Sequence, residues 1–135
     1  MKNNFGLYIH VPFCASKCRY CDFYSFAGKQ SQMDDYVEVL FWHADKFAPQ
    51  FAGRQVDTVY FGGGTPSYLG PKRLKALLSS VQKHYVLSKD AEITLEANPD
   101  SAGDWRALRT LRRAGFNRIS LGMQSSIEGE LRAVG

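Results

Sequence analysis

The sequence predicts an α/β fold built on a parallel sheet. Four times along the chain a short apolar segment is followed by a segment in which apolar residues recur at helical spacing, which indicates successive β/α units. The chain has 135 residues, of which 44% are hydrophobic and 22% are charged. This composition is typical of a modest globular domain and not of a disordered or fibrous chain.

The elements follow one another in a regular order. Pro71 lies near the start of the second expected helix, Gly115 is the expected C′ residue of the third, and Ser125 with Glu128 predicts a capping box for the fourth. The expected strands are residues 5–11, 56–61, 91–97 and 117–123, and the helical patterns cover residues 33–47, 74–81 and 105–114 and begin again after residue 125.

The faces of the strands distinguish an open doubly wound sheet from part of a (β/α) barrel. An open sheet covered by helices on both faces is apolar on both, whereas three of these strands carry one polar face. That face suits the interior of a barrel around a polar ligand. The polar positions are Tyr8 and His10, then Glu92, Thr94 and Glu96, then Arg118, Ser120, Gly122 and Gln124. Four strands cannot close a barrel, so we expect residues 1–135 to be the first four β/α units of a larger one, with an open sheet edge after residue 123.

Charge and terminal sequence exclude several function classes. The excess of basic residues is small, 17 against 13 acidic, and much of it comes from arginines on the third expected helix, beside an apolar stripe of Trp105, Leu108 and Leu111. A solvated helix face explains them better than a nucleic-acid surface. The first residues lack a signal-peptide pattern and no apolar run has membrane-spanning length, so we expect a cytoplasmic protein with reduced thiols.

All three cysteines lie in one short segment after the first expected strand. Cys14, Cys18 and Cys21 are close enough to hold three corners of an iron–sulfur cubane, which leaves the fourth iron free to bind a small molecule. Two alternatives remain: a structural zinc site with His10 as the fourth ligand, and three buried free thiols. The paired C-x-x-C spacing that zinc prefers is absent.

Further polar or glycine-rich segments follow the other expected strands. Gly62, Gly63, Gly64 and Thr65 form a loop that exposes backbone and admits close approach of a ligand, although a simple tight turn is an alternative. Glu96 and Gln124 offer a carboxylate and a carboxamide, which are solvated strand-end residues in the simpler interpretation. Carboxyl ends of barrel strands meet at one rim, where barrel enzymes place their active sites, so we expect these groups to face one site.

Four segments in order, YIHVPFCASKCRYCDF, YFGGGTPS, LEANPDS and GFNRISLGMQS, resemble the radical S-adenosylmethionine (SAM) proteins related to oxygen-independent coproporphyrinogen III oxidase. The resemblance runs from about residue 7 to the end. It implies a 4Fe–4S cluster on Cys14, Cys18 and Cys21 whose open iron binds SAM, with an electron donor such as a flavodoxin or ferredoxin. Reductive cleavage of SAM would give a 5′-deoxyadenosyl radical.

The resemblance also implies roles for individual residues. The loop from Gly62 to Thr65, including Gly63 and Gly64, would bind the SAM amino group. Glu96 would contact the ribose, Gln124 and Tyr8 would line the SAM pocket, and Tyr20 would pack on the adenine side. Further SAM contacts of the family lie beyond residue 135, and we expect no turnover of substrate by this segment alone.

Two subfamilies compete within this resemblance. HemW-like proteins are haem chaperones, whereas the oxidase decarboxylates two propionates of coproporphyrinogen III. The oxidase carries another cysteine two residues after the third, where this chain has Phe23, and it has a long segment before its first strand. Both features favour the HemW-like subfamily, and whether the whole protein is an enzyme stays open. A non-catalytic zinc or redox-sensing module would not explain the glycine loop, and a SAM-dependent methyltransferase would not need the cysteines.

Overall fold

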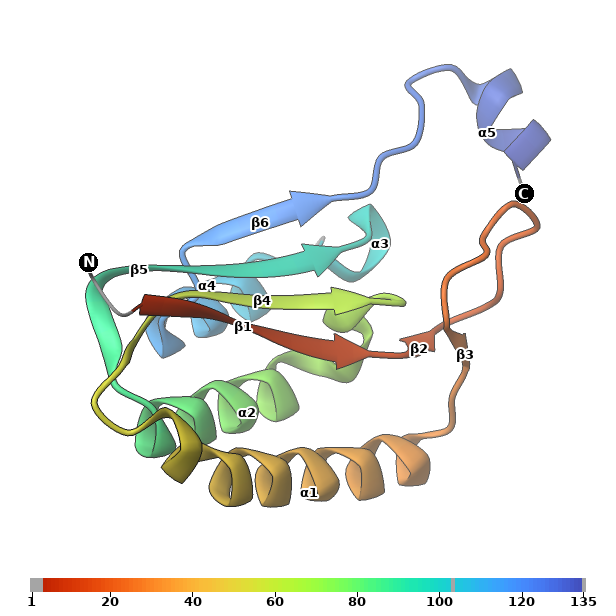
Figure 1. Ribbon diagram of the computed structural model, residues 1–135. Helices are drawn as coiled ribbons and strands as arrows, with labels where there is room; N and C mark the ends of the chain where they lie inside the picture. The colour runs from red at the N-terminus through yellow and green to blue at the C-terminus, as the bar shows by residue number, and fades with distance from the viewer. Residues whose placement is uncertain (1–3, 103, 135) are drawn as a thin grey trace.

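A parallel four-stranded sheet, with helices packed against one of its faces, forms the body of the computed structural model, which describes residues 4–102 and 104–134 (Figure 1). The strand order is β1-β4-β5-β6, and every neighbouring pair is parallel. This confirms the predicted α/β class and its four β/α units. The strands of this sheet are β1 (Asn4–Val11), β4 (Gln55–Gly63), β5 (Leu87–Ala97) and β6 (Arg118–Leu121).

Three long helices cover the apolar face of the sheet, and α2 packs against both α1 and α4. Leu74, Leu77, Leu78 and Val81 of α2 are buried, as the helical periodicity predicts. Short helices fill the connections. The helices are α1 (Gln30–Phe47), α2 (Gly70–His84), α3 (Pro99–Ala102), α4 (Trp105–Ala114) and α5 (Glu128–Val134), with 3₁₀ turns η1 (Ala48–Phe51) and η2 (Pro66–Leu69).

The register of the sheet aligns the polar face. Tyr8 pairs with Tyr60, Tyr60 pairs with Thr94, and Thr94 pairs with Arg118, so one row crosses all four strands. Side chains alternate along each strand, so the neighbours of this row point to the helices. Those neighbours form the core: Val59, Phe61, Ile93 and Leu95 are at most 5% exposed. The predicted division into a polar and an apolar face is confirmed for β1 and β5, and β4, for which no division was predicted, shows the same one.

The fourth β/α unit departs from the expectation. The strand ends at Leu121 instead of Met123, and the side chains of Ile119 and Leu121 are 44% and 51% exposed. This exposure has a structural cause: α5 extends away from the sheet and leaves the apolar face of β6 without a covering helix (Figure 1). The predicted pairing of Ser125 with Glu128 in a capping box is wrong. Ser125 Oγ instead accepts a hydrogen bond from the Ile127 amide and donates one to the Glu130 carboxylate.

The arginine-rich helix α4 ends where the sequence predicts, but only part of its predicted apolar stripe is buried. Gly115 adopts a φ of 124° and its amide donates to the Leu111 carbonyl, which is the geometry of a helix C-terminus that favours glycine. Leu111 is buried, whereas Trp105 is 61% exposed. The guanidinium of Arg109 lies 5.9 Å from the centre of the Trp105 ring, which indicates a cation–π contact on the surface.

A second, two-stranded sheet, which the sequence did not predict, contains Cys14 and lies on both sides of Cys18 and Cys21 in the chain. It consists of β2 (Phe13–Cys14) and β3 (Phe26–Ala27), which pair in parallel. The amide of Phe26 also donates to the Pro12 carbonyl at 2.8 Å. The chain between them is thereby closed into a loop, residues 15–25 (the cysteine loop), that projects beyond the carboxyl end of β1 (Figure 1). Within the described part of the chain, no helix has both the length and the apolar character needed to cross a membrane.

Candidate cofactor site

A cavity of about 220 Å³ lies beyond the carboxyl ends of the sheet strands, where the sequence predicts a binding site. It joins four segments that are far apart in the chain: the cysteines of β2 and the cysteine loop, the glycine loop (residues 62–65), whose first two residues end β4, the end of β5 and the turn after β6. The lining residues are Cys14, Cys18, Tyr20, Cys21, Phe23, Gly64, Thr65, Ala97, Asn98, Gly122 and Gln124. All three cysteines therefore face one space.

The cysteines are free and partly buried. Cys14 belongs to β2, and its Sγ lies 3.5 Å from the hydroxyl of Thr65, which can donate to it. Cys18 and Cys21 are tied by a hydrogen bond from the Cys21 amide to the Cys18 carbonyl. Tyr20 lies between them, and its pKa is raised, first by partial burial and then by the sulfur of Cys18. Thiols at the edge of one cavity, with a hydroxyl donor beside them, suit a cluster held by thiolates.

Gly64 supplies an independent test of whether a cluster fits here. A Cβ atom added to Gly64 would lie 2.9 Å from Cys14 Sγ and 2.8 Å from the Phe13 carbonyl oxygen. A side chain at this position would therefore occupy the space beside the first cysteine. In residues 4–102 and 104–134 no group of three or more His, Cys, Asp or Glu side chains is arranged to hold a metal ion. The three thiolates of a cubane bind three different iron atoms. A cluster therefore needs thiols around one cavity, whereas a single metal ion needs all of its ligands around one position.

The glycine loop is held in place by hydrogen bonds that its main-chain amides donate to neighbouring segments. The amide of Gly64 donates to the Val11 carbonyl and that of Thr65 to the Phe13 carbonyl, both at 2.8 Å. The amide of Gly63 donates to Glu96 Oε2 at 3.1 Å. Three successive N–H donors are thus committed within the protein. The loop is suited to accept hydrogen bonds from a ligand, as an amino group requires, and not to cradle an anion.

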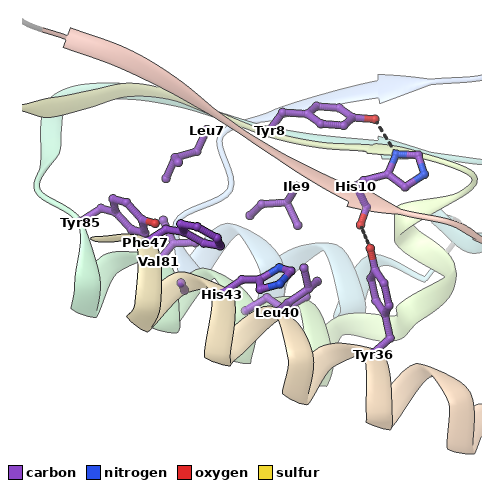
Figure 2. A pocket seen from close by; sticks show the side chains of 12 residues that line it. Leu7, Tyr8, Ile9, His10, Tyr36, Leu40, His43, Phe47, Val81 and Tyr85 are labelled. Carbon is purple, nitrogen blue, oxygen red and sulfur yellow. Dashed lines mark hydrogen bonds between the residues drawn. The ribbon is translucent and has the colours of Figure 1, made fainter. Parts of the chain in front are cut away.

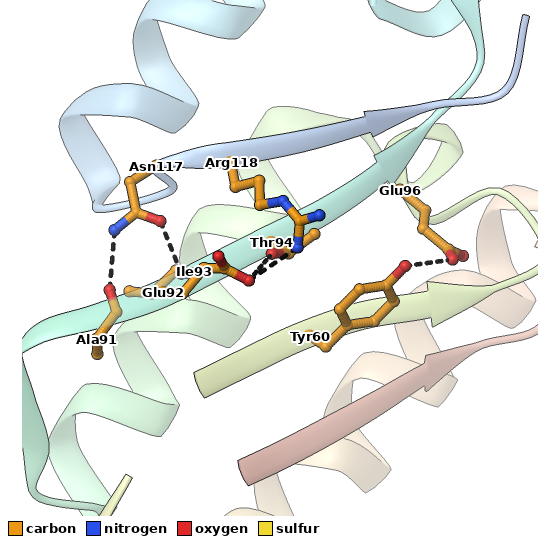
Figure 3. A network of polar contacts seen from close by, with 8 residues as sticks. All are labelled: Tyr60, Ala91, Glu92, Ile93, Thr94, Glu96, Asn117 and Arg118. Atoms are coloured by element: carbon orange, nitrogen blue, oxygen red, sulfur yellow. Dashed lines mark hydrogen bonds and ion pairs between the residues drawn. The ribbon is translucent and has the colours of Figure 1, made fainter. Parts of the chain in front are cut away.

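Glu96 is the centre of a network on the polar face of the sheet (Figure 3). Its Oε1 accepts a hydrogen bond of 2.7 Å from the Tyr60 hydroxyl, while its Oε2 accepts from the Gly63 amide. The bond to Glu96, followed by partial burial, raises the pKa of Tyr60. Tyr60 was not among the predicted site residues, although its parity with Gly62 along β4 places it on the polar face.

Gly62 is where three predicted or newly found residues converge. A Cβ at Gly62 would lie 2.8 Å from the Tyr60 ring, 3.0 Å from Glu96 Oε2 and 3.0 Å from the Tyr8 ring. The rings of Tyr8 and Tyr60 stack with centroids 6.1 Å apart. Tyr8 is 60% exposed and does not line the cysteine cavity, but it lies next to the loop that does. Partial burial and then the Glu96 carboxylate raise the pKa of Tyr8.

Gln124 reaches the cavity through an unusual backbone conformation. Its φ is 63°, and no other non-glycine residue in the described part of the chain has a positive φ. The turn after β6 thereby directs Gln124 to the cavity rim beside Gly122 and Asn98. The predicted site residues thus divide into two adjoining groups. One group lines the cavity: Cys14, Cys18, Cys21, Tyr20, Gly64, Thr65 and Gln124. The other group lies on the far side of Gly64 from the cavity: Tyr8, Gly62, Gly63 and Glu96.

His10 does not join the cysteines. One ring nitrogen is hydrogen-bonded to the Tyr8 hydroxyl and the other to the Tyr24 carbonyl. The structure therefore does not support the alternative in which His10 completes a zinc site. The simpler interpretation, a histidine satisfied by protein hydrogen bonds, matches these contacts.

The opposite end of the polar face holds a structural network (Figure 3). Arg118 forms an ion pair of 2.9 Å with Glu92 across β5 and β6. The side chain of Asn117 accepts a hydrogen bond from the Ile93 amide and donates one to the Ala91 carbonyl. These contacts attach β6 to the sheet, and β6 leads into the turn that presents Gln124.

A larger cavity, of about 310 Å³, lies on the other side of β1 (Figure 2). It is lined mainly by apolar side chains of β1, α1 and α2, among them Ile9, Leu40 and Val81. It contains none of the cysteines and none of the glycine loop. The chemistry of the lining residues, and not the volume of the cavity, therefore favours the smaller cavity as the candidate cofactor site.

The family model described as the Radical SAM superfamily matches residues 8–132. The curated "Heme chaperone HemW" of Mycobacterium tuberculosis is 46% identical over 125 residues, which are 90% of this chain and 32% of that protein. The protein of the same name from Escherichia coli strain K12 is 45% identical over 131 residues, 96% of this chain and 34% of that one. This chain thus spans about a third of the length of these relatives.

Two further matches have other names. "Radical S-adenosyl methionine domain-containing protein 1, mitochondrial" of Danio rerio is 38% identical over 130 residues, 96% of this chain and 29% of that protein. The solved structure of coproporphyrinogen III oxidase (HemN) from Escherichia coli, described as a radical SAM enzyme, is similar with a TM-score of 0.89 and 35% identity. That match covers 96% of this chain and 30% of the oxidase.

Proposed function

Because this chain belongs to the radical SAM superfamily, we propose that Cys14, Cys18 and Cys21 hold a 4Fe–4S cluster in the cavity they line, and that this cluster binds SAM. The observation that carries the proposal is the convergence of three thiols, one from β2 and two from the cysteine loop, on a single cavity that Gly64 lines without a side chain. When bound, the cluster supplies an electron for reductive cleavage of SAM.

The protein contributes binding and orientation around this cofactor. The glycine loop, with its N–H groups committed internally, would offer carbonyl oxygens to the SAM amino group. Glu96 would contact the ribose from a position fixed by Tyr60 and Gly63. Tyr20 and Gln124 would line the pocket, and Tyr8 would lie behind the glycine loop, next to Gly62. An electron donor such as a flavodoxin or ferredoxin would approach the cysteine loop, where Phe23 and Tyr24 are 72% and 78% exposed.

Reconstitution tests the cluster. Anaerobic treatment of the chain with iron and sulfide should give a brown protein with about four iron atoms per chain. Replacing any one of the cysteines by serine should abolish that uptake, while Ser16→Ala, in the same loop, should leave it unchanged. A colourless protein that binds one zinc per chain would contradict the proposal.

For the whole protein we propose a HemW-like haem chaperone. Two curated relatives with that name are 45% and 46% identical to this chain, and Phe23 stands where the oxidase has a further cysteine. The alternative is an oxygen-independent coproporphyrinogen III oxidase, which the structural similarity to such an enzyme favours. Haem titration and a coproporphyrinogen decarboxylation assay on the complete protein distinguish them. Decarboxylation without stable haem binding would reverse the proposal.

A further inference from the structure

His10 is hydrogen-bonded to three tyrosines from its place near the end of β1. Its Nδ1 lies 3.1 Å from the Tyr8 hydroxyl, and its Nε2 lies 3.1 Å from the carbonyl oxygen of Tyr24 in the cysteine loop. Its own carbonyl accepts a hydrogen bond of 2.7 Å from Tyr36 of α1 (Figure 2). The residue is thereby held at its main chain and engaged at both ring nitrogens.

The partners determine which ring nitrogen carries the proton. A carbonyl oxygen only accepts, so Nε2 must be the donor to Tyr24. In the neutral ring Nδ1 then accepts, and the Tyr8 hydroxyl donates to it. One imidazole thus orients the phenol of Tyr8 and restrains the cysteine loop at the same time.

The glycine loop packs directly on the same ring. A Cβ at Gly63 would lie 2.7 Å from His10 Cε1 and 2.8 Å from Nδ1. Gly63 also has a φ of 122°, a conformation that side-chain-bearing residues rarely adopt. The absence of a side chain at Gly63 is what lets the glycine loop and the imidazole lie in contact.

The contact with Tyr24 is placed where the loop needs restraint. The last cysteine, Cys21, lies three residues before Tyr24, and main-chain pairing resumes only at Phe26. Between these points Lys17 Nζ donates to the Phe23 carbonyl at 2.6 Å, but Lys17 belongs to the loop itself. In the described part of the chain, the His10–Tyr24 bond is the side-chain hydrogen bond that ties residues 22–25 to the main sheet.

We propose that His10 is a positioning residue that holds the cysteine loop against the glycine loop, so that the loop keeps its shape before and after it takes up a cluster. This rests on the proposed function for the identity of the bound group. The residue binds no metal itself. It acts through the Tyr24 carbonyl and through its packing on Gly63.

Two substitutions of similar polarity separate this role from general stability. In His10→Gln the amide nitrogen reaches the position of Nε2 and can still donate to Tyr24. In His10→Asn the shorter side chain ends near the position of Nδ1 and can reach only Tyr8. His43→Ala, an exposed histidine on α1, is the matched control.

Hydrogen exchange of the cluster-free chain measures the loop directly. We expect the amides of Cys21 and Phe26, which donate to the Cys18 and Pro12 carbonyls at the two ends of the stretch 22–25, to exchange roughly tenfold faster in His10→Asn, the factor expected for one hydrogen bond of typical strength. His10→Gln and His43→Ala should exchange like the wild type. After reconstitution, His10→Asn should lose iron to a chelator several-fold faster than His10→Gln.

A failure of this inference can be told apart from a failure of the proposed function. If the wild type takes up no cluster, the proposed function fails, and the exchange rates still decide the role of His10. If His10→Asn and His10→Gln exchange equally, whether both match the wild type or both are faster, the tie to Tyr24 is not what positions the loop and the inference is overturned.

Discussion

The hydroxyl of Tyr60 on β4 lies 2.7 Å from the carboxylate of Glu96 on the neighbouring strand β5. The other oxygen of that carboxylate accepts from the Gly63 amide, so one side chain joins two strands and the glycine loop. This arrangement orients Glu96 before any ligand arrives. It also makes the stability of the sheet depend on a residue of the candidate site.

Tyr60→Phe should destabilise the chain, because it removes a donor from a charged, partly buried acceptor. We expect the free energy of unfolding to fall by about 1 kcal/mol at neutral pH, measured by urea denaturation. Tyr85→Phe is the control, since the Tyr85 hydroxyl makes no hydrogen bond within the described residues and lies away from Glu96. Equal stability of Tyr60→Phe and the wild type would contradict the importance of the bond.

The same bond predicts a pH dependence at the alkaline end. The pKa of Tyr60 is raised, so the folded state binds the phenolic proton more tightly than the unfolded chain does. The resulting stabilisation is complete below the unfolded pKa of about 10 and is lost as the pH rises through the folded pKa. The stability difference between wild type and Tyr60→Phe should therefore shrink above pH 10. A stability difference that grows above pH 10 would contradict this prediction.

Asn117→Ala should be more costly than Tyr60→Phe. It leaves the Ile93 amide and the Ala91 carbonyl without their side-chain partner at the start of β6. We expect a loss of about 2 kcal/mol in the free energy of unfolding. Thr110→Ala removes one exposed hydrogen bond on α4 and should lower the free energy of unfolding by less than about 0.5 kcal/mol, because surface substitutions have small effects. Similar losses for both variants would show that the asparagine bridge is not special.

Gly64→Ala should impair the cavity and leave the sheet intact, because its Cβ would meet Cys14 Sγ and the Phe13 carbonyl. We expect iron uptake on reconstitution to fall several-fold while the cooperative thermal transition remains. Gly129→Ala is the matched control, since an added Cβ there meets no atom within 4 Å. Full iron uptake by Gly64→Ala would mean that the cluster does not occupy the space beside this glycine.

Much of the fold follows from periodicity, and the exceptions have physical causes. Alternation in β1, β4 and β5 persists for several residues, so their positions and faces are predictable. The strands β2 and β3 have two residues each, too few to carry any period. Ile119 and Leu121 look like core residues in sequence, but their burial depends on a covering element that this chain does not place on them.

The candidate site divides in the same way. The cysteines, the glycine loop, Glu96 and Gln124 are marked by residue type and by their place after strands, and the structure brings them to one rim. Tyr60 and Asn117 both act through partners on the neighbouring strand β5. Their roles therefore depend on the register of the strands, which the sequence does not reveal. The backbone of Gln124, with its φ of 63°, and the link from His10 to Tyr24 arise only from the folded turns.

Electron paramagnetic resonance of the reduced, reconstituted chain, recorded with and without SAM, tests the cofactor assignment most directly. If Cys14, Cys18 and Cys21 hold a cluster with an open iron beside the glycine loop, the reduced protein gives a 4Fe–4S signal whose shape changes when SAM is added. A reduced cluster whose spectrum is indifferent to saturating SAM, or a chain that forms no paramagnetic cluster at all, would contradict it.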